Sequence, residues 1–308
     1  MPLDADLKAL LDKAAGLPKL ETLSVSEARR LHEARARPPA AEVGRVDERS
    51  IDGPGGSLRL RIYTPADGRA PRPLLVFCHG SGFVLCSLDT HDGMCRNLCA
   101  GSGYVVVSVD YRLAPEAKFP AGSDDCLAAT RWAAANAAAL GAIPGFVVVG
   151  GDSAGGNMAA VTALRCRDEG GPPLAGQVLI YPVTDHYSVE YASYAENAEG
   201  YGLGRLGMQW FWDHYLGTPE QASDPLASPM RAPDLAGLPP ALVLTAEFDP
   251  LRDEGEAYGA RLAAAGVACR TVRLDGVNHG FLALTGWVAK ADVAMAIAVD
   301  WLKALVPA

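Results

Sequence analysis

The sequence contains no long hydrophobic run and few aromatic residues. No stretch approaches the roughly 18 uninterrupted apolar residues that a membrane-spanning helix needs. Only 7% of the 308 residues are aromatic, whereas 49% are apolar and 20% are charged, as is typical of a globular chain. The first twenty residues mix charged side chains among apolar ones and so do not resemble a secretory signal. We therefore expect a cytoplasmic globular protein with no membrane partner.

A surplus of positive charge is also missing. The chain has 27 Lys and Arg residues against 36 Asp and Glu residues, which gives a net charge of −9. Proteins that bind nucleic acids or anionic membranes generally present a basic surface to the phosphates. We expect no nucleic-acid partner.

The cysteine pattern favours neither disulfides nor a metal site. The seven cysteines are odd in number and scattered, without a C-x-x-C pair or a histidine cluster at metal-binding spacing. They are Cys78, Cys86, Cys95, Cys99, Cys126, Cys166 and Cys269. We expect reduced thiols in the core, and no metal or organic cofactor.

Short apolar runs alternate with helical stretches along most of the chain. Residues 43–63 show two alternating segments around a Gly/Pro turn, which is typical of a β-hairpin. Further apolar runs occupy residues 74–78, 104–109, 146–150, 176–181, 241–246 and 268–274. Continuous hydrophobicity indicates strands that are covered on both faces, as in a parallel sheet flanked by helices. The pattern predicts a single α/β domain over residues 1–308 with a mostly parallel eight-stranded sheet.

Residues 185–240 interrupt this rhythm, because they contain no clear strand and are rich in Tyr, Trp, Pro and Gly. Within them, Met208, Phe211, Trp212 and Tyr215 are spaced as one face of a helix. This apolar face could pack the insertion onto the body of the domain, or form part of a pocket wall. Candidate aromatic lining residues are Tyr191, Tyr194, Tyr201 and Trp212.

The most informative motif is G-D-S-A-G, which joins an apolar strand to a helix. Gly151 and Gly155 flank Ser153 at spacing G-x-S-x-G. In a sharp strand-to-helix turn, side chains at the glycine positions would collide with the neighbouring backbone, and the serine hydroxyl is exposed above the sheet. The alternative is a plain glycine turn. We interpret Ser153 as a nucleophile.

A serine nucleophile needs a histidine to accept its proton. His279 lies in a polar, glycine-flanked loop directly after the last predicted strand. The histidines at positions 32, 91, 186 and 214 lie in helical or inserted segments, and we interpret them as solvated or structural. His279 is therefore the predicted base.

The histidine in turn needs an acid that fixes its tautomer and stabilises its charged form. Asp249 follows a buried strand and precedes Pro250, so it lies in a loop at the strand end. Asp253 and Glu254 are placed like ordinary acids in the first turn of a helix. Asp249 is the predicted acid.

Attack on a carbonyl places negative charge on its oxygen, which fixed N–H donors stabilise by about 3 to 4 kcal/mol each. The amide of Ala154, directly after the nucleophile, is one such donor. The other donors should come from a small-residue loop after an earlier strand, and His79-Gly80-Ser81-Gly82 is placed there.

Together these motifs resemble the hormone-sensitive-lipase-like family of α/β-hydrolase esterases. The resemblance rests on HGSGF, DYRLAPEAKFPA, GDSAGG, DPLRDEG and NHGF, in the order nucleophile, acid, base. It implies an α/β-hydrolase fold, a helical cap formed by residues 1–40 and about 185–235, and hydrolysis of short-chain acyl esters through an acyl-enzyme. It also implies an oxyanion hole built from the amides of Ser81, Gly82 and Ala154, and makes a homodimer plausible.

Two positions depart from the family pattern, because Ser81 and Cys86 occur where glycine is expected. If the backbone requires positive φ at Ser81, serine costs about 1 to 2 kcal/mol there. Two other functions stay open: an amidase or peptidase that uses the same triad, and a non-catalytic ligand-binding protein with the same fold. The natural substrate, which we expect to be a small ester, is not identified by the sequence.

Overall fold

The computed structural model describes residues 2–306, and these form one sheet of eight strands in the order β1-β2-β4-β3-β5-β6-β7-β8. The strands are β1 (Arg45–Gly53), β2 (Gly56–Thr64), β3 (Arg72–Cys78), β4 (Val105–Val109), β5 (Ala142–Asp152), β6 (Leu174–Ile180), β7 (Ala241–Phe248) and β8 (Cys269–Asn278). The β1–β2 hairpin pairs antiparallel, and β2 is antiparallel to β4. All other neighbouring strands are parallel. The predicted α/β-hydrolase sheet is confirmed.

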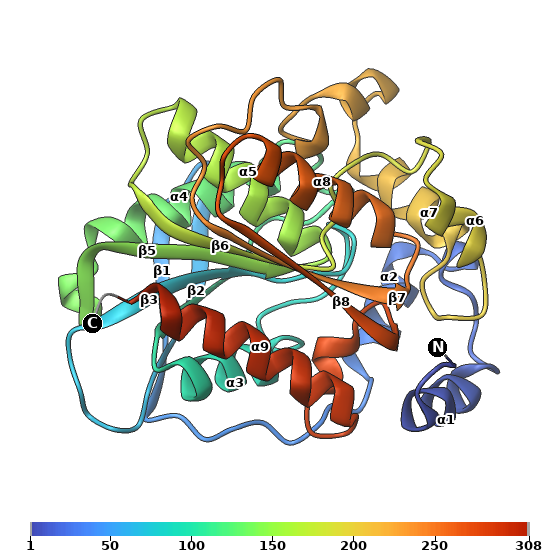
Figure 1. Cartoon of the computed structure of the whole chain (residues 1–308), viewed down its shortest axis with the longest axis horizontal. Coiled ribbons are helices and arrows are strands. Elements are labelled where there is room, and N and C mark those ends of the chain that lie inside the picture. Colours follow the sequence, from blue (N-terminus) through green and yellow to red (C-terminus); the bar gives the residue numbers. More distant parts are fainter. Residues whose placement is uncertain (1, 307–308) are drawn as a thin grey trace.

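Helices cover both faces of the sheet. They are α1 (Ala5–Ala14), α2 (Val25–Glu33), α3 (Asp92–Ser102), α4 (Ala121–Ala135), α5 (Ala154–Asp168), α6 (Ala192–Glu196), α7 (Arg205–Tyr215), α8 (Arg252–Ala264) and α9 (Ala289–Leu305). Helices α4, α5 and α8 lie on one face, and α3 and α9 on the other (Figure 1). Helices α2, α6 and α7 lie at the end of the sheet where strands β6, β7 and β8 finish (Figure 1).

The core is divided by the sheet into two apolar layers. On β3, Leu74 and Val76 belong to one layer, whereas Leu75 and Phe77 belong to the other. All four side chains are at most 1% exposed. Alternate residues of one strand thus enter opposite layers, which explains why the buried strands are continuously hydrophobic.

Residues 185–240 form α6, α7 and two short 3₁₀ segments, without a strand. The four apolar residues that define the predicted helical face lie on α7 and are all buried. Tyr194 and Trp212 are at most 1% exposed, so the expectation that these two rings line an open pocket is wrong. Tyr191 and Tyr201 are partly exposed.

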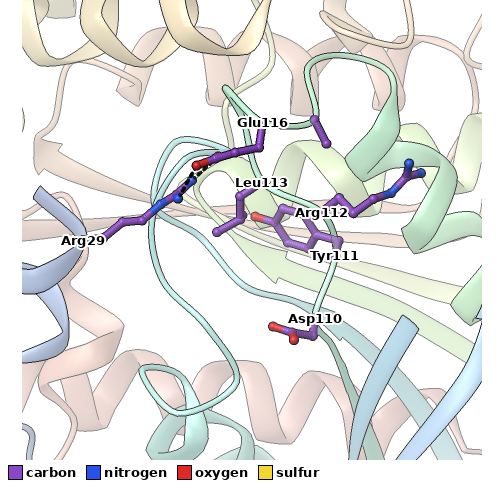
Figure 2. A pocket seen from close by; sticks show the side chains of 7 residues that line it. Arg29, Asp110, Tyr111, Arg112, Leu113 and Glu116 are labelled. Atoms are coloured by element: carbon purple, nitrogen blue, oxygen red, sulfur yellow. Dashed lines mark hydrogen bonds and ion pairs between the residues drawn. The ribbon is translucent and has the colours of Figure 1, made fainter. Parts of the chain in front are cut away.

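Helix α2 is fixed to the body of the domain by Arg29. Its guanidinium donates to the carbonyl oxygens of Val84 and Ala114, each at 2.9 Å. It also forms a two-point ion pair with Glu116, at 2.8 and 2.7 Å, beside a surface recess (Figure 2). These contacts connect α2 with the segments that follow β3 and β4.

All seven cysteines are free, and six of them are buried, while Cys269 is partly exposed. Among the helices of residues 2–306, none combines the length and the hydropathy that crossing a membrane would require.

Candidate active site

Ser153 lies in a strained turn between β5 and α5. Its backbone has φ 56° and ψ −120°, a conformation that non-glycine residues rarely adopt. A Cβ atom at Gly155 would collide with the carbonyl group of Cys78, and one at Gly151 would collide with that of Gly155. The two glycines are therefore required by the sharpness of the turn, as predicted from the motif.

The structure brings Ser153, His279 and Asp249 together in a hydrogen-bonded chain. The distance from Ser153 Oγ to His279 Nε2 is 2.9 Å. On the other side of the ring, His279 Nδ1 lies 2.7 Å from Asp249 Oδ2. A carboxylate only accepts hydrogen bonds, so His279 carries its proton on Nδ1 and accepts the serine hydroxyl at Nε2. This geometry allows proton transfer from the serine to the imidazole.

Asp249 is completely buried, and its orientation is fixed from several directions. Its Oδ1 accepts the backbone N–H of Leu251 at 2.9 Å, which leaves Oδ2 for the histidine. From α6, the Asn197 side chain donates to the Asp249 carbonyl oxygen at 3.3 Å, and the Ser193 hydroxyl donates to that of Pro250 at 2.6 Å. Helix α6 therefore supports the loop that carries the acid.

Glu254 lies in the first turn of α8, as predicted, but its environment is not that of an ordinary first-turn acid. Its side chain is 0% exposed. It accepts the backbone N–H groups of Thr184 and Asp185, at 2.7 and 3.2 Å, and the Tyr194 hydroxyl at 3.1 Å. Burial raises the pKa of this carboxyl well above its usual value, although these donors oppose the rise. Glu254 fixes the start of the 185–240 insertion to α8.

The loop that follows β3 approaches the nucleophile turn closely. Ser81 has φ 82° and Gly82 has φ 63°. The Tyr111 hydroxyl donates to the His79 carbonyl oxygen at 2.7 Å, and the Gly80 N–H donates to Asp152 Oδ1 at 2.9 Å. Residues 79–82 thus lie next to the residue that precedes Ser153.

Ala154 is the first residue of α5. Its amide belongs to the first helical turn, whose N–H groups have no partner within the helix.

The two positions that depart from the family pattern both have positive φ, 82° at Ser81 and 73° at Cys86. Glycine adopts this region without the steric cost that a Cβ atom imposes. The Ser81 hydroxyl lies 3.3 Å from Nε2 of His32 on α2, and Cys86 is 7% exposed. The positive φ values therefore explain why glycine is expected at both positions. The structure also places the Ser81 hydroxyl beside the His32 ring.

His91 and Asp152 form a buried pair that the sequence analysis missed. His91 Nε2 lies 3.2 Å from Asp152 Oδ1, and the two residues are 8% and 6% exposed. Burial lowers the pKa of His91, but the Asp152 carboxylate and the Cys86 side chain together more than offset this and raise it to about 10. The sequence did offer one signal for this pair: Asp152 is an acidic residue at the end of a buried strand, inside the nucleophile motif. Its partner lies 61 positions away in the sequence.

Within residues 2–306, no group of three or more His, Cys, Asp or Glu side chains is arranged to hold a metal ion. What the site does contain is a polarised hydroxyl, a base, a buried acid and nearby amide donors. Such an arrangement can carry out acyl transfer through a covalent intermediate.

Comparison with known proteins gives consistent results. Residues 75–283 match the profile of a family described as alpha/beta hydrolase fold. The chain is 46% identical to the carboxylic ester hydrolase LipN of Mycobacterium tuberculosis over 245 residues, which cover 78% of this chain and 65% of LipN. It is 37% identical to an ethyl acetate hydrolase of Pseudomonas putida, over 98% of this chain and 99% of that protein.

Solved structures agree with these relatives. The fold matches that of a hyperthermophilic esterase from the archaeon Pyrobaculum calidifontis with a TM-score of 0.94 and 42% sequence identity. The match covers 99% of this chain and 100% of the archaeal chain.

Proposed function

Because the chain is a carboxylester hydrolase that belongs to the hormone-sensitive-lipase-like family of α/β-hydrolases, we propose that Ser153 is its nucleophile and that its substrates are short-chain acyl esters. The hydrogen-bonded chain from Ser153 through His279 to Asp249 is the observation that carries this proposal.

In the proposed acylation step, Ser153 Oγ attacks the ester carbonyl carbon while His279 Nε2 accepts the hydroxyl proton. Asp249 stabilises the imidazolium through the 2.7 Å contact with Nδ1. The tetrahedral intermediate collapses when His279 returns the proton to the leaving alcohol, which breaks the ester C–O bond. The acyl group is then attached to Ser153.

In the proposed deacylation step, His279 removes a proton from water, and the resulting nucleophile attacks the acyl-enzyme. The acid is released when the proton returns to Ser153. In both steps the carbonyl oxygen becomes negative, and we assign its stabilisation to the amides of Ser81, Gly82 and Ala154.

Two observations support short acyl groups. The ring of Phe211 on α7 lies where a side chain at Gly82 would be, so the space beside the proposed oxyanion hole is occupied by aromatic side chains. Phe83 stacks on Tyr215 of the same helix, with ring centroids 3.8 Å apart. In addition to these two observations, the Pseudomonas relative is an ethyl acetate hydrolase, whose name refers to a short acyl ester.

We further assign the cap to residues 1–40 and about 185–235, which include α1, α2, α6 and α7. The seven free thiols support a reducing compartment such as the cytoplasm.

A p-nitrophenyl ester series from acetate to palmitate tests the proposal. We expect turnover to be greatest with the short esters, and Ser153→Ala to lower kcat by about 10⁵-fold. Ser123→Ala is the matched control, because Ser123 on α4 is also buried but its hydroxyl donates to the Pro120 carbonyl oxygen. Ser123 has no role in the proposed reaction. We expect this control to retain wild-type turnover.

Three outcomes would overturn parts of the proposal. Wild-type turnover in Ser153→Ala would exclude this nucleophile. A preference for palmitate would exclude the short-chain assignment. Faster turnover of a matched anilide than of the ester would favour an amidase instead.

A further inference from the structure

Asp152 is a buried carboxylate that the proposed mechanism does not use. It occupies the position directly before Ser153 and is 6% exposed. Burying an unpaired carboxylate is costly, so its partners must offset that cost. Those partners are His91, which precedes α3, and the backbone of Gly80.

The hydrogen bonds around His91 indicate that both ring nitrogens carry protons. The Thr90 hydroxyl donates to the Ser87 carbonyl oxygen at 2.9 Å, so it accepts from His91 Nδ1, also at 2.9 Å. On the opposite side, Nε2 lies 3.2 and 3.4 Å from the two oxygens of Asp152, which only accept. The Gly80 nitrogen also lies 3.4 Å from Nε2, but its N–H has its shorter bond, 2.9 Å, to Asp152 Oδ1. His91 and Asp152 therefore form an ion pair. The raised pKa of His91 and the lowered pKa of Asp152 agree with this, although burial opposes both shifts.

The ion pair connects two segments that are far apart in the sequence. Asp152 Oδ1 accepts the Gly80 N–H at 2.9 Å. The residues after Gly80 are Ser81 and Gly82, and Ala154 lies two positions after Asp152. The Gly80–Asp152 hydrogen bond thus links the segment that carries the Ser81 and Gly82 amides to the segment that carries the Ala154 amide. We assign all three amides to the oxyanion hole.

The approach of the two segments leaves no room for adjustment. A Cβ atom at Gly80 would lie 2.7 Å from the Asp152 carbonyl oxygen, which real structures essentially never show. On the other side of the loop, His79 stacks on Tyr111 with ring centroids 4.4 Å apart. Within this close packing, the Asp152 side chain is the hydrogen-bond acceptor that links the loop to the nucleophile turn.

We propose that the His91–Asp152 ion pair is a positioning device for the oxyanion hole, which holds the Ser81 and Gly82 amides in register with the Ala154 amide. His91 keeps the Asp152 carboxylate charged and oriented, and Asp152 holds Gly80. Neither side chain touches substrate. This inference rests on the proposed serine mechanism and adds two positioning residues to it.

The test compares catalysis with the binding of a tetrahedral analogue. We would measure kcat and KM for p-nitrophenyl acetate, and Ki for a trifluoromethyl ketone that forms a tetrahedral adduct with serine. For His91→Ala we expect kcat to fall about 10- to 100-fold with KM within about threefold, because misplaced donors weaken the transition state more than the bound ester. Ki should rise by the factor by which kcat/KM falls.

Three further variants sharpen the comparison. His91→Gln should recover part of kcat, because its amide can still donate to Asp152. Asp152→Asn combined with His91→Gln should be no worse than the more damaged single variant, since coupled residues are not additive. Asp125→Asn is the matched control, because Asp125 on α4 is 1% exposed and paired with Arg112. We expect Asp125→Asn to lower the unfolding midpoint without changing the ratio of Ki to KM.

An unchanged ratio of Ki to KM in folded His91→Ala would overturn the inference, and so would additive effects in the double variant. If His91→Ala does not fold, an unchanged ratio of Ki to KM in folded Asp152→Asn decides against it. Failure of the proposed function is a different result, in which wild type shows no turnover or Ser153→Ala retains it.

Discussion

Ser81 and Gly82 are adjacent residues with positive φ, but only one of them has room for a side chain. The Ser81 hydroxyl lies beside His32, 3.3 Å from its Nε2. The corresponding space at Gly82 is occupied by the Phe211 ring. Substitutions at these two neighbours should therefore have opposite consequences.

We predict that Ser81→Gly retains esterase activity, with a changed rate or acyl preference, because its amide stays available as a donor. Relief of the positive-φ strain, about 1 to 2 kcal/mol, is offset by the greater chain entropy of glycine, about 0.5 to 1 kcal/mol. Turnover of p-nitrophenyl acetate and butyrate, with urea unfolding in parallel, checks this. Gly82→Ser is the contrast and should lose both stability and turnover. Complete loss of turnover in a folded Ser81→Gly variant would contradict the prediction.

The proximity of residues was predictable where a motif carries it, and unpredictable where burial decides. Ser153, Asp249 and His279 were located by their positions after predicted strands, and the structure brings them into contact. The burial of Glu254 and the partner of Asp152 depend on segments about sixty or more positions away, at 184–194 and at His91. No local pattern in the sequence encodes such contacts.

Arg29 on helix α2 contacts the segments that follow β3 and β4. The contacts with the carbonyl oxygens of Val84 and Ala114 are partly buried, whereas Glu116 is 64% exposed. Charged donors to carbonyl groups contribute more to stability than an exposed ion pair does. The carbonyl contacts, and not the ion pair in Figure 2, should fix the helix.

We predict that Arg29→Ala lowers the free energy of unfolding by about 2 kcal/mol and also lowers kcat, because α2 carries His32 next to Ser81. Glu116→Gln removes only the charge of the exposed partner and should cost less than about 1 kcal/mol. Urea unfolding and turnover of a short ester measure both variants. Equal losses in the two variants would show that the ion pair, and not the carbonyl contacts, fixes α2.

Elements were predicted most accurately where both faces of a strand are buried, as in β3 and β4, because hydrophobicity is then continuous. The observed β5 begins at Ala142, before the predicted run at 146–150, and its first residues are partly or fully exposed from Ile143 to Phe146. Strand ends that extend beyond the helices lose the hydrophobic signal while keeping their backbone pairing. For the conformation of the loop after β3, the sequence offered only one signal, which was the presence of Ser81 and Cys86 where glycine is expected.

At the scale of the whole molecule, the charge of His91 couples folding to pH. Its folded-state pKa of about 10 is raised above the usual 6.5, so the folded chain retains a proton that the unfolded chain releases. The resulting stabilisation is fully present below pH 6.5 and is lost as pH rises through about 10. A second titratable neighbour is Cys86. Burial raises the pKa of its thiol, but hydrogen bonds to His32 and His91 lower it well below the usual value.

We predict that between about pH 7 and about pH 9 the free energy of unfolding falls more steeply in the parent than in His91→Gln, by roughly 1.4 kcal/mol per pH unit. Both proteins carry Cys86→Ala, so that the thiol does not contribute. Because Cys86 also raises the pKa of His91, the steeper slope should end at a lower pH in this background than in the wild type. Urea unfolding at a series of pH values gives the two slopes. Parallel slopes would mean that His91 is not charged in the folded protein.

The bonds from Ser193 and Asn197 to the loop of Asp249 have a consequence for protein engineering. Substrate range in such a molecule would ordinarily be altered by transplanting the 185–235 segment from a relative. Here that graft would also remove the two hydrogen bonds that hold the loop of Asp249. A chimaera could therefore acquire a new pocket and at the same time a lower kcat. Carrying Ser193 and Asn197 into the donor segment is the way to separate selectivity from rate.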